Sequence, residues 1–152
     1  MFKVTRKEVT TVETVGYMVL QRNIYSGHWS AFRGFPVRIF NKFHKARQAK
    51  YSKNWPLEMY EGIKFIDDYV LHFYYTNLKQ AVSQAKAIVS LITDIRCHCI
   101  VVRCIIPKNA TVYYDDSCNF DYAGTDIANI IDIPIVSYRS WLNDGRRTID
   151  EQ

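Results

Sequence analysis

One segment of the sequence, from Arg33 to Lys53, combines positive charge with aromatic rings in a pattern that suits binding to an anion. It carries seven of the chain's 20 Lys and Arg residues and no Asp or Glu. The rest of the chain therefore holds 13 cations against 15 anions, so the net charge of +5 comes from this segment. Lys and Arg neutralise phosphates and aromatic rings stack on bases, so this composition is typical of a surface for single-stranded nucleic acid.

The candidate binding residues lie in this segment and in the aromatic loop before it. Stacking on bases is predicted for Tyr25 and Trp29. Two other interpretations stay open: Phe43 anchors the segment to the core and leaves a solvated rim of cations, or the patch steers an acidic partner such as a host protein. The cations predicted to contact an anion are Arg33, Arg38, Lys42, Lys45, Arg47 and Lys50, together with Arg22 before the loop.

Three of the four cysteines lie in an apolar run from Cys97 to Ile106 that is typical of a β-strand. On a strand Cys97 and Cys99 face one side and Cys104 faces the other. Together with His98 they offer zinc ligands, but structural zinc sites usually repeat a cysteine pair, and the sequence has no second pair. We therefore expect buried reduced thiols and no metal.

No set of residues predicts a catalytic centre. His28 lies in a loop rich in serine, but the sequence places no triad partner beside it. The acidic pair Asp115 and Asp116 is more typical of a solvated turn than of a two-metal nuclease. The six glycines are isolated and form no phosphate-binding loop. Binding is therefore expected rather than catalysis.

The elements that would hold these residues indicate a single α+β domain over residues 1–152, with a mixed, mainly antiparallel sheet. Asn77 and Gln80 have capping-box spacing, and the apolar spacing of three and four that follows predicts one long amphipathic helix over about 77–93. A short basic helix or loop is expected over about 42–53, ending before Pro56. The final residues are expected to fray.

The sequence contains no apolar run of membrane-spanning length, and charges occupy the N-terminus where a signal peptide would be apolar. We expect a cytoplasmic protein with no membrane contact. The abundance of Ile, Tyr, Asn and Lys hints at an AT-rich genome such as that of a phage, in which case the compartment is the cytoplasm of the host cell.

The order of elements from residue 15 to residue 116, including "LHFYYTNLKQAVSQAK" and "HCIVVRCIIPKNATVYYDD", resembles small phage-encoded accessory proteins. It also resembles, more distantly, the core of ADP-ribosyltransferases. That second resemblance implies that Arg22, near the end of a strand, and Thr76, before the helix, hold the nicotinamide cofactor NAD. The strand that carries the catalytic Glu in that family holds Arg103 and no Glu here, so the resemblance favours ligand binding over transfer.

The leading hypothesis is therefore a small phage-type accessory protein that uses no cofactor and binds an anionic ligand through a basic aromatic surface. Nucleic acid, a nucleotide and an acidic protein are the candidate ligands. The alternative is a divergent ADP-ribosyltransferase-like enzyme that uses NAD.

Overall fold

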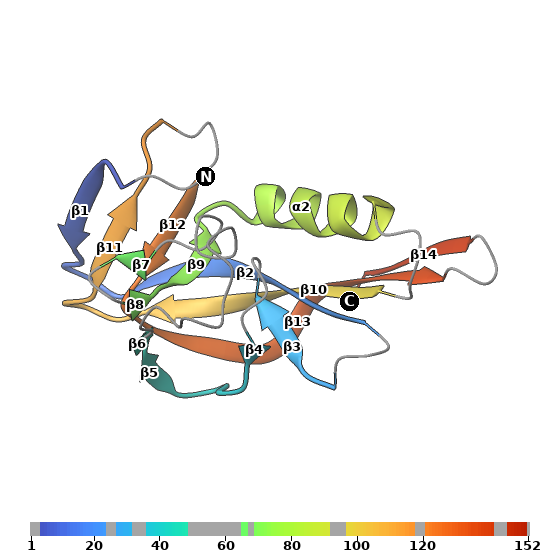
Figure 1. Cartoon of the computed structure of the whole chain (residues 1–152), viewed down its shortest axis with the longest axis horizontal. Helices are drawn as coiled ribbons and strands as arrows, with labels where there is room; N and C mark the ends of the chain where they lie inside the picture. Colours follow the sequence, from blue (N-terminus) through green and yellow to red (C-terminus); the bar gives the residue numbers. More distant parts are fainter. Residues whose placement is uncertain are drawn as a thin grey trace, which may run out of the picture.

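The structure is a computed structural model of the 152-residue chain (Figure 1). It describes residues 4–23, 27–31, 36–48, 65–66, 69–91, 97–117, 121–141 and 146–151. The helix is α2 (Leu78–Leu91). The strands are β1 (Arg6–Val9), β2 (Thr14–Asn23), β3 (Trp29–Ala31), β4 (Pro36–Val37), β5 (Phe43–Lys45), β6 (Arg47–Gln48), β7 (Phe65–Ile66), β8 (Tyr69–Val70), β9 (His72–Tyr75), β10 (Cys97–Ile106), β11 (Thr111–Tyr114), β12 (Tyr122–Thr125), β13 (Ile127–Trp141) and β14 (Arg146–Glu151).

One large antiparallel sheet organises the described residues. Its strand order is β1-β11-β12-β9-β2-β10-β13-β14, with β3 paired to β2, β4 to β3, and β5 to β13. A small second sheet has the order β6-β8-β7. The longest pairings join β10 to β2 and to β13, so β10 lies at the centre of the sheet. Most of its side chains are buried, on both faces, as expected for a central strand.

The two faces of β10 support two hydrophobic clusters. One face carries Cys97, Cys99 and Val101 and packs against α2, through Ala85 and Val89; we call it the helix face. In Figure 1 the helix lies along this side of β2, β10 and β13.

The opposite face carries Ile100 and Val102, which pack with Leu20 and Ile130. Side chains from the β3–β4 region, including Trp29, cover part of it. The central strands therefore present one face to the helix and the other to β3 and β4, and the second face extends beyond these short strands.

The start of α2 shows how local sequence fixes an element. The Oδ1 atom of Asn77 accepts the N–H groups of Lys79 at 2.8 Å and Gln80 at 3.4 Å, which caps the first turn. The side chain of Gln80 does not close a capping box; its Oε1 accepts the N–H of Asp121 at 2.9 Å and ties the helix to the start of β12.

The predicted α+β fold class is wrong. The described residues lie mostly in antiparallel strands, and they include a single helix of 14 residues. The region after residue 126, which shows no clear periodicity, forms the 15-residue strand β13. Register shifts opposite Val102 and the presence of Pro134 break the alternation of β13, so its sequence does not show a period of two.

The expected basic helix or loop over about 42–53 is also wrong where the structure describes it. Phe43 to Lys45 form β5, which pairs with Ile127–Asn129 of β13, and Arg47–Gln48 form β6. In β5 the side chain of His44 is half-buried, and its neighbours on either side are exposed. This inward-outward alternation and the pairing with β13 override the helix propensity of the basic residues.

Candidate anion-binding site

Four neighbouring strands place one residue each side by side on the face opposite the helix. The β2–β10 register pairs Arg22 with His98, and the β10–β13 register pairs His98 with Arg139. The β2–β3 pairing, continued by one position, sets Trp29 beside Arg22. Adjacent strands lie about 4.8 Å apart, so side chains in direct register are neighbours. We call Trp29, Arg22, His98 and Arg139 the cationic row.

Ring contacts hold the row together. The Cζ atom of Arg22 lies 4.4 Å from the centroid of the Trp29 ring, a cation–π distance. The centroids of Trp29 and His98 are 5.0 Å apart with their planes at 61°. The buried hydroxyl of Ser137 forms a hydrogen bond of 2.5 Å with Nε2 of His98, which fixes the orientation of the imidazole. Arg22 and Arg139 are exposed.

This arrangement suits an anion. Guanidinium groups bind carboxylate and phosphate oxygens through two parallel N–H bonds, and two of them flank the imidazole in the row. The backbone register of β14 places Thr148 next to Arg139 and Asp150 next to Ser137. The row itself combines two permanent cations, one titratable ring and one aromatic plane on one side of the sheet.

A second group of cations begins beside the row. Val37 of β4 pairs with Trp29, and Arg38 follows it directly. Arg38, Lys42 and Lys45 are exposed, and the Phe43 ring is 44% exposed. We call Arg38, Lys42, Phe43 and Lys45 the basic segment. In Figure 1 the chain from β4 to β5 runs along the side of the sheet away from α2.

Asn41 positions the basic segment. Its backbone is left-handed, with φ of 63°, a conformation that Asn tolerates better than most residues. Its N–H donates to the carbonyl of Ile130 at 2.8 Å, and its Oδ1 accepts the N–H of Asp132 at 3.1 Å. These bonds anchor the turn before Lys42 and Phe43 to β13.

The structure accounts for part of the predicted site. It brings Arg22 and Trp29 into contact and places Arg38, Lys42 and Lys45 on the surface. Two row residues, His98 and Arg139, were missed as anion ligands; the only signal was that each interrupts a strand of apolar or small residues. Tyr25, Arg33 and Lys50 lie outside the described residues, and Arg47 lies in β6 with its side chain outside them.

The ADP-ribosyltransferase resemblance assigns Arg22 and Thr76 to NAD, but Arg22 lies near the end of β2 and Thr76 lies beside the start of that strand. Thr76 follows β9 directly, and its N–H donates to the carbonyl of Asp121 at 2.8 Å. Tyr75 pairs with Tyr17, so Thr76 falls about six residues from Arg22 along β2. At about 3.3 Å per residue the separation is about 20 Å.

Cys97 and Cys99 point to the face of β10 opposite His98, whereas Cys104 lies on the same face as His98. The Sγ atoms of Cys97 and Cys99 lie 4.0 Å apart on the helix face, whereas His98 lies in the row. The contact with Cys97 and burial raise the pKa of Cys99, and burial raises the pKa of Cys104 to about 12. The described residues contain no group of three or more His, Cys, Asp or Glu that could hold a metal.

A second histidine pair lies away from the row, where β5 meets β9. The ring centroids of His44 and His72 are 4.5 Å apart, and Nε2 of His72 lies 3.3 Å from the carbonyl oxygen of His44. Burial and the neighbouring His44 lower the pKa of His72 to about 4. Burial also lowers the pKa of His44, to which the charge of Lys42 contributes. Both rings are thus held in the neutral form at pH 7.

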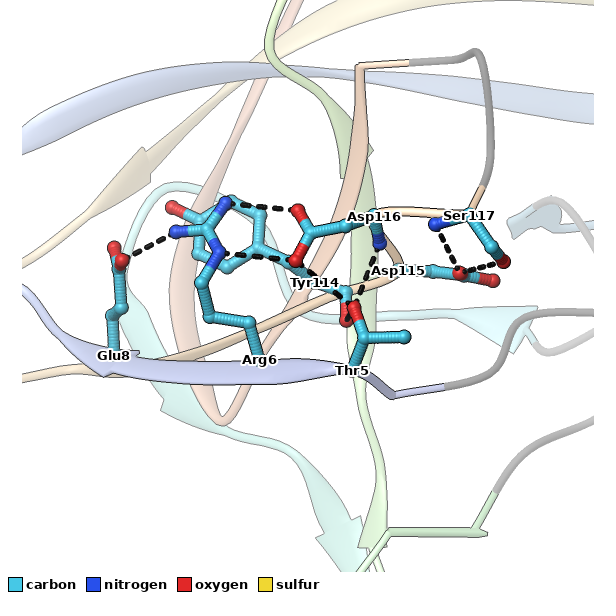
Figure 2. A network of polar contacts seen from close by, with 7 residues as sticks. All are labelled: Thr5, Arg6, Glu8, Tyr114, Asp115, Asp116 and Ser117. Atoms are coloured by element: carbon cyan, nitrogen blue, oxygen red, sulfur yellow. Dashed lines mark hydrogen bonds and ion pairs between the residues drawn. The ribbon is translucent and has the colours of Figure 1, made fainter.

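Asp116 belongs to a surface network that fastens β1 to the end of β11 (Figure 2). The guanidinium of Arg6 contacts both carboxylate oxygens of Asp116 at 3.2 Å, bonds to Glu8, and lies 4.0 Å from the centroid of Tyr114. The hydroxyl of Thr5 donates to Oδ2 of Asp116 at 3.0 Å. These bonds lower the pKa of Asp116.

Asp115, the other member of this acidic pair, has a different environment. Its carboxylate is buried and accepts the N–H of Ser117 at 3.0 Å (Figure 2). One carboxylate closes a turn and the other pairs with an arginine, so both have structural partners.

Comparisons with known proteins find no matching family model, no matching curated protein and no matching solved structure. Among the described residues, no helix has the length and apolar character needed to cross a membrane. The site must therefore be interpreted from its own geometry.

Proposed function

We propose that this protein binds single-stranded nucleic acid through the cationic row and the basic segment, and that it acts by binding rather than by catalysis. The observation that carries the proposal is the direct cross-strand adjacency of Arg22, His98 and Arg139. Arg22 and Arg139 lie one strand to either side of His98, so an anion bound over the row would meet positive charge from both sides.

The basic segment supports a polymeric ligand over a small one. It begins beside Trp29 and continues to Lys45, so its exposed cations offer successive contacts to a chain of phosphates. The half-exposed ring of Phe43 lies between two lysines, and such rings stack on bases whose faces are free. In a duplex those faces are occupied, so a single strand fits this surface better.

The NAD-dependent alternative requires a different pair of residues to lie close together. It needs Arg22 and Thr76 in one cofactor site, whereas the strand register separates them by about 20 Å. The binding hypothesis needs only residues that lie next to one another, and it is the one we develop.

Fluorescence anisotropy with a labelled single-stranded oligonucleotide tests the proposal. We expect Arg22→Glu and Arg139→Glu each to weaken binding at least tenfold, because each replaces an attraction to phosphate with a repulsion. Arg103→Glu is the matched control: Arg103 is exposed on the same strand β10, but it faces the helix side. Arg103→Glu changes the net charge of the protein by the same amount as each of the two row variants.

Two results would contradict the proposal. In the first, all three variants lose the same affinity, which would mean that net charge and not the row governs binding. In the second, the wild-type protein does not bind the oligonucleotide but binds an acidic polypeptide, which would assign the surface to a protein partner.

A further inference from the structure

The geometry of the cationic row points to a more specific ligand, and we infer that the row binds the phosphomonoester of a nucleotide or of a nucleic-acid end. This inference rests on the proposed function and names the group that the row recognises. The observations are the direction of the row, the fixed position of two of its side chains, and its place at one end of the basic segment.

The row runs across the strands, so its two arginines lie on either side of one position. His98 lies at the centre, and Arg22 and Arg139 stand one strand to either side, about 5 Å away at the backbone. Long arginine side chains on both sides of an imidazole can reach a single group above it. A phosphomonoester carries about −1.5 to −2 charges at pH 7 and offers three acceptor oxygens, whereas a backbone diester carries one charge.

Two members of the row are held before any ligand arrives. The guanidinium of Arg22 stacks on Trp29, and the imidazole of His98 is fixed by the hydroxyl of Ser137. Ser137 is only 3% exposed, so this support lies beneath the row. Side chains that are already ordered lose less conformational entropy on binding, which favours a defined geometry over a diffuse attraction.

The surroundings of the row suit a nucleotide better than a free inorganic anion. The guanidinium of Arg22 lies over the Trp29 ring, and bases stack on guanidinium planes as well as on rings. The basic segment begins next to Trp29, so a strand whose end is bound in the row can continue toward Arg38 and Lys42.

Paired ligands that differ by one phosphate test this inference. Calorimetry compares adenosine monophosphate with adenosine, and anisotropy compares hexanucleotides that end in a 5′-phosphate, a 3′-phosphate or hydroxyls only. We expect at least a tenfold preference for the phosphorylated member of a pair. Arg139→Ala and His98→Gln should abolish the preference, whereas Arg103→Ala should retain it.

Different results would overturn the phosphate preference and the binding of nucleic acid. Equal affinity for phosphorylated and hydroxyl-ended ligands would overturn the inference and leave the proposed function standing. Phosphate-dependent binding of the mononucleotide, with no binding of any hexanucleotide, would support the inference and overturn the proposed function. Because His98 is half-buried, the melting temperature of each variant is measured; Arg139 is exposed, so Arg139→Ala decides the outcome if His98→Gln fails to fold.

Discussion

His72 shows at the residue scale how burial shapes the chemistry of this chain. Its pKa is lowered to about 4, first by burial and then by His44, while its Nε2 contacts the carbonyl of His44. An unfolded chain would restore the ordinary value of about 6.5. Between these two values the unfolded state binds a proton that the folded state does not, so the stability of the fold must decrease as the pH falls through this range.

We expect the free energy of unfolding to fall by about 3 kcal/mol from this group as the pH drops from about 7 to 4, since one pKa unit corresponds to about 1.4 kcal/mol. Urea denaturation at pH 7 and at pH 4 measures this decrease in the free energy of unfolding. His72→Phe should remove this part of the pH dependence and His28→Phe should keep it. An unchanged pH dependence in His72→Phe would contradict the assignment.

Gly16 marks a second residue-scale constraint, because the backbone of β2 touches an aromatic ring there. A Cβ atom at Gly16 would lie 2.3 Å from Cδ2 of Tyr74, a residue that is only 5% exposed. Either the ring or the strand would have to move. At Gly27, by contrast, a Cβ atom would have no heavy atom of the described residues within 4 Å, its chain neighbours aside.

Gly16→Ala should therefore destabilise the fold by about 1–3 kcal/mol, the usual cost of overpacking a core. Gly27→Ala is the control and should leave stability nearly unchanged. Thermal melting of the three proteins provides the comparison. Equal melting temperatures would show that the sheet can shift at Gly16 without strain.

At the scale of the element, the edge strand β1 depends on its side chains. All four residues of β1 are exposed, so little hydrophobic burial holds the strand in place. The bonds from Thr5 and Arg6 to Asp116 join it to the end of β11 (Figure 2). Exposed ion pairs contribute little to global stability, but they can limit local opening of an edge.

Asp116→Ala should accordingly speed amide hydrogen exchange in β1 while leaving the global unfolding transition almost unchanged. Asp132→Ala, at an exposed position in β13, is the control and should leave exchange in β1 as it is. If exchange in β1 is the same in both variants, the backbone pairing with β11 alone holds the strand.

The elements also show what the sequence could and could not predict. The pattern after Asn77 is local, and a helix lies there, although it is the only one among the described residues and does not make the fold α+β. The long strand β13 was missed because Pro134 and the register shifts opposite Val102 disturb its alternation. Residue type pointed to Arg22 and Trp29, but the row depends on pairings between β2, β10 and β13, whose register no local pattern shows.

At the scale of the whole molecule, the helix and the cationic row lie on opposite faces of the central strands. The helix face of the central strands is occupied by α2. The opposite face carries the row, and the basic segment starts at its margin. The sequence shows that positive charge is concentrated in one segment; the fold places Arg22 and Arg139, which are distant in sequence, on either side of His98.

The most direct test of this account is the salt dependence of oligonucleotide binding by the wild-type protein and by the double variant Arg22→Ala, Arg139→Ala. Each phosphate contact contributes about 0.7 to the slope of log K against log salt concentration for a single strand. We expect the double variant to lose about 1.4 from the slope, with Arg103→Ala at the wild-type value. A double variant that keeps the wild-type slope would show that the row does not contact the nucleic acid.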